Sequence, residues 1–122
     1  MRKLKNSELG RIDVAKFKKS QKTPLIIILD DIRSLNNIGS IFRTADAFII
    51  EKIILCGITA SPPNKDIQKT ALGSTESVDW EYQKDISVVI KNLKKDGVYI
   101  WSIEQAENSN KLNKLKIPND IK

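Results

Sequence analysis

The chain has 122 residues, of which 40% are hydrophobic and 30% are charged, as expected for one globular domain. It has a single cysteine, Cys56, and no histidine, which excludes a disulfide framework, a zinc ribbon, Ser-His or Cys-His catalysis and His-based metal sites; no metal site is expected. The longest apolar run has five residues, against the ~20 of a membrane helix, and the N-terminus lacks the apolar stretch of a secretory signal. We therefore expect no membrane segment and a cytoplasmic location.

Lysine and arginine are concentrated at the two ends of the chain. The net charge is +6; residues 1–22 hold eight basic and two acidic residues, and residues 108–122 hold four basic and one acidic, so the middle is slightly acidic. Such ends are suited to contact a polyanion such as RNA. The alternative is that Lys-rich ends are only solvated and keep the protein soluble, and charge alone does not decide between the two.

The first half of the chain predicts short helices, a strand and a longer helix. One or two short helices are expected within residues 7–19, with Ser7 and Asp13 as candidate N-caps. Residues 25–29 (LIIIL) predict a strand that is apolar on both faces, which is typical of the centre of a parallel sheet. A helix is expected over residues 36–48. Its predicted buried stripe consists of Ile38, Ile41, Phe42, Ala45 and Phe48.

The second half continues the alternation of strands and helices. We expect a strand at 52–56, a loop at 57–66, a helical turn near 66–71, a strand at 78–82, a helix from its cap Asp85 to Lys95 ended by Gly97, and a strand at 98–103. The aromatic residues expected to pack in the core or on a sheet face are Trp80, Tyr82, Tyr99 and Trp101. This alternation predicts an α/β fold with a small, mostly parallel sheet and flanking helices.

Residues 29–48 join the carboxyl end of the first strand to a helix, which is where open α/β sheets bind ligands. The residues expected there are Asn36, Asn37, Gly39, Ser40 and Arg43. A glycine inside a helix costs about 1 kcal/mol relative to alanine, so Gly39 indicates close approach of a backbone or a ligand. A helix N-terminus favours an anion such as a phosphate, and Arg43 can bind one bidentately. The alternative is structural: asparagines as caps, glycine for packing and arginine as a surface residue.

Two acidic residues, Asp30 and Asp31, also follow the first strand. Receiver-like phosphoacceptor domains place an acidic pair there to hold Mg²⁺. Such domains also need a third aspartate and a lysine after later strands, and the chain does not supply these at matching positions. The sequence therefore argues against a receiver domain, and a structural role for the pair is as consistent with the sequence as a role as a general base.

The segment NNIGSIFRTADAF, residues 36–48, resembles the first motif of the SpoU/TrmH family of RNA ribose methyltransferases, within the knotted SPOUT class. The matching residues are Asn37, Gly39 and the run Arg43-Thr44-Ala45. The segments KIILCGITASPPN and KTALGSTESVDWEY resemble the family's second strand, its loop and the stretch that leads into its third strand. The resemblance extends over nearly the whole chain, from about residue 2 to residue 119.

The resemblance implies transfer of a methyl group from S-adenosylmethionine to a ribose 2′-hydroxyl of tRNA or rRNA. In the family, the arginine that matches Arg43 lies at the reacting ribose and phosphate, and the asparagine that matches Asn37 supports that site. The resemblance therefore implies Arg43 and Asn37 as catalytic residues. The expected RNA-binding residues are Asn36, Gly39, Ser40, Arg43, Thr44, Lys65 and Lys69. Members of the family form homodimers with the active site at the interface.

The sequence departs from the family near its C-terminus. The family carries two further motifs there, which form the knot and bind most of the S-adenosylmethionine, and neither is present in these 122 residues. We therefore expect the N-terminal part of the SPOUT α/β-knot fold without the knot, and no cofactor-binding residue is assigned. We expect a basic lead with short helices over residues 1–23 and a partial methyltransferase domain over residues 24–122. The chain alone is expected to bind cofactor weakly or not at all and to have little activity; the alternative is a non-catalytic RNA-binding module.

Overall fold

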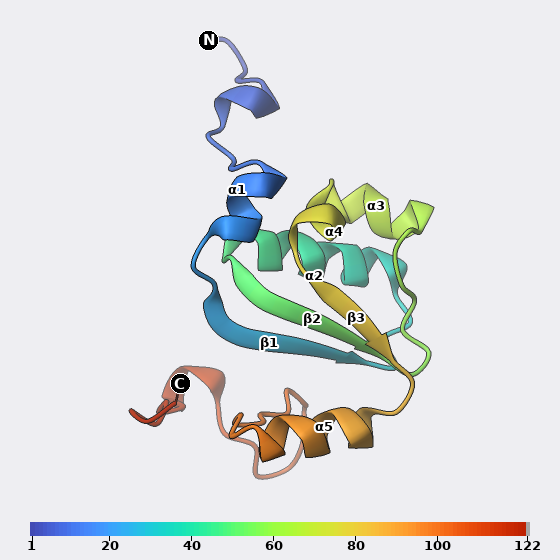
Figure 1. Cartoon of the computed structure of the whole chain (residues 1–122), viewed down its shortest axis with the longest axis vertical. Coiled ribbons are helices and arrows are strands. Elements are labelled where there is room, and N and C mark those ends of the chain that lie inside the picture. Colours follow the sequence, from blue (N-terminus) through green and yellow to red (C-terminus); the bar gives the residue numbers. More distant parts are fainter. Residues whose placement is uncertain (122) are drawn as a thin grey trace. The chain divides into compact units, whose positions relative to one another are not determined.

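A computed structural model describes residues 1–121 of the chain (Figure 1). The chain divides into two compact units, Met1–Lys84 and Asp85–Lys122, which are described separately. The elements of the first unit are η1 (Asn6–Glu8), α1 (Val14–Lys19), β1 (Thr23–Asp30), α2 (Leu35–Ala47), β2 (Ile50–Cys56), α3 (Lys65–Ala71), α4 (Ser74–Ser77) and β3 (Trp80–Gln83). Those of the second are α5 (Ile86–Lys95) and η2 (Leu112–Lys114). Within residues 1–121, no helix combines the length and apolarity needed to cross a membrane.

The sheet of the first unit has three parallel strands in the order β1-β2-β3. This confirms the expected fold class. The central strand is β2, whose residues 53–56 are all buried, and not β1 as the apolar pattern predicted. Leu25 of β1 is 51% exposed, and Pro24 has no N–H to donate to a ladder, which suits an edge strand. A continuous apolar run indicates a strand, but it does not distinguish the edge of a sheet from its centre.

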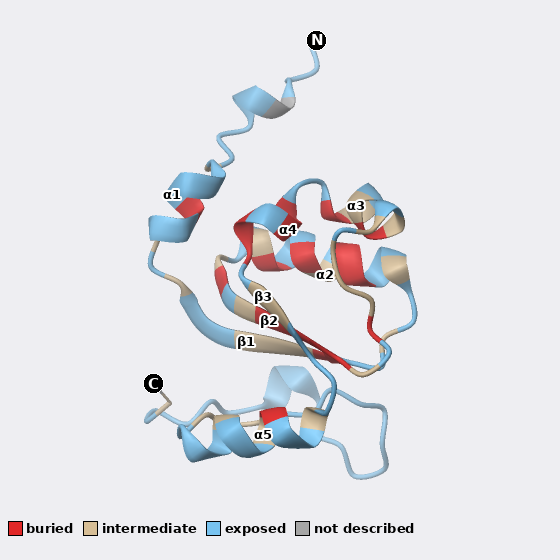
Figure 2. Ribbon diagram, turned by 45° about the vertical axis from the view of Figure 1, so that its right-hand side comes forward, coloured by how far each residue is buried: buried red, intermediate tan, exposed pale blue. Residues whose placement is uncertain are grey.

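Helix α2 covers the sheet with its apolar face. It packs on β2, and α3 and α4 lie against α2 (Figure 1). Of the predicted stripe, Ile38, Phe42 and Ala45 are buried and Ile41 is half-buried, whereas Phe48 is the C-cap residue and is 66% exposed. The buried residues therefore gather on α2, α3, α4 and the strands (Figure 2). The core cluster consists of Phe17, Leu29, Ile38, Phe42, Ala45, Ile50, Ile53, Leu55, Ile67, Ala71 and Val78.

The short helices before the sheet were predicted in outline. Asp13 caps α1, as expected, and its side chain accepts a hydrogen bond from the Lys16 N–H at 2.8 Å. Ser7 lies within η1 and does not precede a helix, so its predicted capping role is wrong. The four-residue helix α4 was not predicted, because its sequence STES carries no apolar periodicity.

The second unit contains a well-predicted helix and a wrongly predicted strand. The side chain of Asp85 caps α5 by accepting from the Ser87 N–H at 2.8 Å, and Gly97 follows the helix with a φ of +79°. Residues 98–103 are irregular instead of forming a fourth strand. Within the described part of this unit the segment has no strand to pair with, and an apolar run does not form a stable strand without a neighbour.

The aromatic side chains are more exposed than predicted. Trp80 packs against the core, but Tyr82, Tyr99 and Trp101 are each roughly half exposed. The Tyr99 hydroxyl donates to the Asp120 carboxylate at 3.2 Å, and the negative charge of Asp120 raises the pKa of Tyr99. Packing in the core or on a sheet face was inferred from alternation in two strands, and one of those strands is not formed.

Candidate functional site

Most of the predicted site residues lie on one exposed side of α2. Ser34 caps this helix, and its hydroxyl accepts a hydrogen bond from the Asn37 N–H at 3.2 Å. Residues four and seven apart lie on the same face of a helix, so the spacing of the predicted residues brings them together. All five members of this set are exposed. We call them the polar stripe of α2: Asn36, Asn37, Ser40, Arg43 and Thr44.

Gly39 lies on the opposite, buried side of α2. A Cβ atom at this position would lie 2.1 Å from the Thr70 Oγ1 and 2.2 Å from the Ile67 carbonyl oxygen of α3. Only a residue without a side chain allows α2 and α3 to approach this closely. The sequence left two explanations open for this glycine, the approach of a ligand and the packing of a neighbouring backbone. The geometry favours packing, because α3 is what approaches Gly39.

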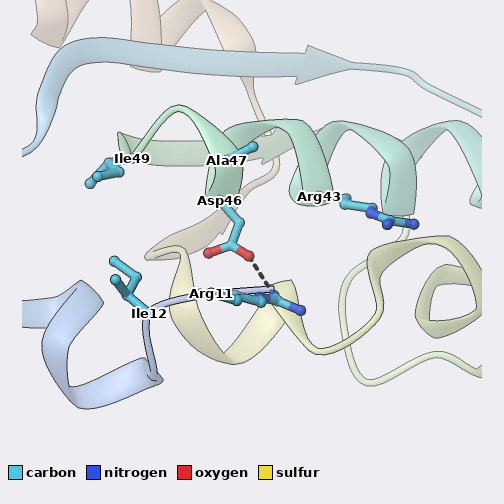
Figure 3. A pocket seen from close by; sticks show the side chains of 7 residues that line it. Arg11, Ile12, Arg43, Asp46, Ala47 and Ile49 are labelled. Carbon is cyan, nitrogen blue, oxygen red and sulfur yellow. Dashed lines mark hydrogen bonds and ion pairs between the residues drawn. The ribbon is translucent and has the colours of Figure 1, made fainter. Parts of the chain in front are cut away.

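A cleft of about 370 Å³ lies beside the C-terminal half of α2 (Figure 3). It is lined by Gly10, Arg11, Ile12, Arg43, Asp46, Ala47 and Ile49. This volume is near the lower end of the ~300–1,000 Å³ typical of ligand pockets. Of the polar stripe, only Arg43 belongs to the lining. The cleft thus joins the predicted catalytic arginine to the basic N-terminal segment of the chain.

The two arginines of the cleft are held differently. Arg11 pairs with the Asp46 carboxylate and also donates to the Leu72 carbonyl oxygen at 3.0 Å. The Asp46 side chain is only 10% exposed, whereas that of Arg11 is 48% exposed. Arg43 makes no hydrogen bond or ion pair with any residue that the structure describes. Both guanidinium groups extend toward the N-terminal half of α2 (Figure 3), and they leave N–H donors free for a ligand.

Sequence reasoning missed Arg11 and Asp46 as members of a site. Arg11 is 35 residues away from Asp46 in the chain, and it was seen only as part of a basic lead. Asp46 lies inside the recognised segment but off the apolar stripe, and nothing local indicates its partner. The sequence held one indication of this pair: an acidic residue in the segment that resembles the family motif, and a surplus of basic residues in residues 1–22 that could pair with it.

The predicted lysines lie on α3 or at its start. Lys65 and Lys69 are both exposed, and Lys69 pairs with Asp66 at 2.8 Å. Neither lysine lines the cleft. Helix α3 packs on α2 at Gly39, so these lysines belong to the helix next to the polar stripe, and their contact with RNA stays a prediction.

Asp31 has a structural partner. Its Oδ1 accepts a hydrogen bond from the Ile58 N–H at 2.9 Å, and its own N–H donates to the Cys56 carbonyl oxygen at 3.2 Å. The backbone of Asp31 has a φ of +49°, a conformation that aspartate tolerates better than most residues. The structural alternative for this member of the acidic pair therefore has direct support.

A family model and individual relatives of this chain all point to the same protein family. Residues 24–121 match the model of the SpoU rRNA Methylase family. The 23S rRNA (guanosine-2′-O-)-methyltransferase RlmB of Blochmanniella floridana is 33% identical over 82 residues, which are 67% of this chain and 32% of that protein. An uncharacterized tRNA/rRNA methyltransferase of Borreliella burgdorferi is 31% identical over 106 residues, which are 87% of this chain and 45% of that protein. The chain thus spans about a third to a half of the length of these relatives.

Solved structures show the same fold. A crystal structure of an RNA 2′-O ribose methyltransferase superposes with a TM-score of 0.54 and 20% identity over 65% of this chain and 31% of that chain. The SpoU methyltransferase AviRb from Streptomyces viridochromogenes, solved with the cofactor AdoMet, superposes with a TM-score of 0.56 and 23% identity over 77% of this chain and 33% of that chain. The match of the family model to most of the chain, together with the shared fold, shows that this chain belongs to the SpoU rRNA methylase family.

Proposed function

We propose that the chain is the RNA-binding and catalytic-arginine part of an S-adenosylmethionine-dependent RNA 2′-O-ribose methyltransferase, acting on tRNA or rRNA. The observation that carries the proposal is the exposed Arg43, which has no partner among residues 1–121 and lies on the motif helix at the edge of a cleft. An unpaired guanidinium group in a cleft that contains a second arginine is suited to a phosphate group.

The proposed chemistry places the guanidinium group of Arg43 beside a ribose 2′-hydroxyl and its neighbouring phosphate. A 2′-hydroxyl is a poor nucleophile, and a cation beside it stabilises the negative charge that develops on the oxygen as its proton passes to solvent and the oxygen takes up the methyl group. Asn37 and Ser40 lie along the same exposed side of α2, and their polar side chains would orient the ribose. Because the chain has no histidine, charge stabilisation by Arg43 is the contribution that this part of the site offers.

The residues of the cleft do not fit S-adenosylmethionine itself. The cofactor carries a positive sulfonium group and an ammonium group against a single carboxylate and is therefore a net cation, and the cleft presents two arginines and one carboxylate that is already paired with Arg11. Like charges in such a site repel each other. The cofactor would supply the methyl group when bound, but we assign no residue of this chain to hold it.

The charge of Arg43 can be tested by RNA binding of the full 122-residue chain. We expect Arg43→Gln to weaken binding of a fluorescein-labelled RNA hairpin about fivefold and to lower the slope of log affinity against log salt by about one, as for the loss of one phosphate contact. The readout is fluorescence anisotropy at several salt concentrations. Lys52→Gln is the matched control, because Lys52 lies on β2, pairs with Glu81 and carries the same charge. If both substitutions weaken RNA binding equally, Arg43 contributes only to the net charge of the chain, and the proposal is contradicted.

The alternative function is a non-catalytic RNA-binding module. Two observations favour it: the residues of the polar stripe and of the cleft all belong to the first unit, and the charges of the cleft do not suit the cofactor. Methyl transfer from S-adenosylmethionine to RNA by the purified chain would exclude this alternative. RNA binding without cofactor binding would support it.

Two further features of the proposal follow from the family. A homodimer is proposed for the full-length enzyme, and a cytoplasmic location is proposed because tRNA and rRNA are found there. Sedimentation of the chain with and without RNA tests the first of these, and cell fractionation tests the second.

A further inference from the structure

Two loops meet at the carboxyl end of the sheet, and hydrogen bonds join them. One is the turn of residues 31–34, between β1 and α2, and the other begins at Gly57, directly after β2. The Asp31 N–H donates to the Cys56 carbonyl oxygen at 3.2 Å, and the Asp31 carboxylate accepts from the Ile58 N–H at 2.9 Å. A Cβ on Gly57 would lie 2.0 Å from that carboxylate, so the glycine makes room for it.

The hydroxyl group of Thr59 forms the buried part of this junction. Thr59 is 3% exposed, and its Oγ1 donates to the Leu29 carbonyl oxygen at 2.9 Å and accepts from the Ile32 N–H at 3.0 Å. These two groups lie on either side of the turn that leads from β1 into α2. The hydroxyl therefore bridges the turn: it pairs the Ile32 N–H, which lies between β1 and α2, and adds a bond to the carbonyl group of Leu29 near the end of β1.

The same part of the chain also contacts the other side of α2. After Thr59 the chain continues into α3, where the Thr70 Oγ1 donates to the Asn36 carbonyl oxygen at 2.8 Å. Asn36 is in the first turn of α2, and Ile32 is only two residues before its cap, Ser34. Two threonine hydroxyls of one segment, residues 57–71, thus hold the entry to α2 and its first turn.

We propose that Thr59 and Thr70 are positioning residues for RNA recognition, which set the direction in which the first turn of α2 presents Asn36 and Asn37. The inference rests on the proposed function, because it takes RNA as the ligand of the polar stripe. Neither threonine touches the RNA in this proposal. They act through the backbone of residues 29–36, and a change at Thr59 alters the contact made by Asn37 with no change of charge.

The test compares isosteric substitutions in the full 122-residue chain. Thr59→Val removes the hydroxyl and keeps the shape, and we expect RNA hairpin binding to weaken about fivefold, which corresponds to the net contribution of one hydrogen bond. Thr59→Ser keeps the hydroxyl and should bind within about twofold of the unchanged chain. Thr75→Val is the matched control, because Thr75 is buried and accepts from the Gln68 Nε2 at 2.9 Å but lies on α4, outside the junction. We expect this variant also to retain binding.

A double-mutant cycle with Asn37→Ala separates positioning from general loss of structure. If Thr59 acts through the first turn of α2, Thr59→Val weakens RNA binding less once Asn37 is alanine, because only Asn36 is then left to be misplaced. Should Thr59→Val fail to fold by circular dichroism, Thr70→Val replaces it in the same cycle, since Thr70 is less buried. Amide hydrogen exchange of Ile32, which donates to Thr59, should become faster in Thr59→Val and not in Thr75→Val.

Three outcomes would overturn the inference. These are unchanged RNA binding by Thr59→Val, an equal loss in Thr75→Val, or a full effect of Thr59→Val in the Asn37→Ala background. If Arg43→Gln weakens binding while Thr59→Val does not, the proposed function stands and only this inference fails. If the unchanged chain binds no RNA, the proposed function fails first, and the inference fails with it.

Discussion

At the scale of single residues, the paired and unpaired arginines of the cleft have different roles. Arg11 is held by the Asp46 carboxylate and the Leu72 carbonyl oxygen, whereas Arg43 has no partner among the residues that the structure describes. A guanidinium group carries five N–H donors, and two contacts leave three of them on Arg11 for a ligand. Asp46 therefore lowers the charge of the cleft and at the same time fixes one of its cations.

This double role of Asp46 predicts different RNA affinities for two substitutions that change the charge equally. Asp46→Asn keeps an acceptor for Arg11, and because it removes a negative charge, we expect RNA affinity equal to or higher than that of the unchanged chain. Asp46→Ala also removes the acceptor, and we expect it to bind about threefold more weakly than Asp46→Asn, the effect of releasing one ordered side chain. Fluorescence anisotropy with the same hairpin measures both.

Asp79→Ala provides the control for charge. Asp79 pairs with Lys18 and does not line the cleft, so this substitution should leave affinity unchanged or raise it. If Asp46→Ala binds as tightly as Asp46→Asn, then Asp46 does not order Arg11 for RNA binding.

Part of the candidate site was predictable at this scale. The polar stripe follows from spacing alone, because residues 36, 40 and 43 lie on one face of any helix that includes them. The cleft was not predictable, since Arg11 and Asp46 meet only after the chain between them has folded. Gly39 was identified as unusual from its cost in a helix, but only the structure shows that α3 is what approaches it.

At the scale of elements, α2 and α3 form a closely packed pair around Gly39. We expect Gly39→Ala to lower the free energy of unfolding by about 1–3 kcal/mol, the usual cost of overpacking, because the added Cβ meets a backbone carbonyl at 2.2 Å as well as the side chain of Thr70. Urea denaturation followed by circular dichroism measures this.

Ser40→Ala is the control for Gly39→Ala. It lies on the exposed side of the same helix and should stay within about 0.5 kcal/mol of the unchanged chain. A fully stable Gly39→Ala variant would mean that the approach of α2 and α3 is not tight.

The elements that were predicted well are those with complete local signals. Helix α5 has an N-cap, an apolar stripe and a terminal glycine, and its bounds agree with the prediction. The strand expected at 98–103 and the central place expected for β1 are both wrong. A strand is defined by its neighbours in the sheet, which lie elsewhere in the chain and leave no local mark on its sequence.

At the scale of the whole molecule, the chain covers about a third to a half of the relatives it matches. The motifs to which the family resemblance assigns most of the cofactor contacts are not among its 122 residues.

We expect isothermal titration of S-adenosylmethionine into the purified chain to show no binding at micromolar concentration. RNA binding of the same sample serves as the control for a folded protein. Clear micromolar binding of the cofactor would show that this chain contains a cofactor site, and would contradict the expectation drawn from the missing motifs.

The free side of β1 has a consequence for how this sheet accepts another strand. Among the described residues, β1 pairs only with β2, so its other side offers unpaired N–H and C=O groups. Pro24 cannot donate there, and the Thr23 N–H points to the other side, where it donates to the Ile49 carbonyl oxygen beside β2 at 2.8 Å. An incoming strand therefore finds its usable ladder along residues 25–29, and it must bring an apolar face to match the leucines and isoleucines of that stretch. The proline at the start of β1 thus limits the register in which another strand can pair with β1. The apolar composition of β1 determines which kind of strand can extend the sheet.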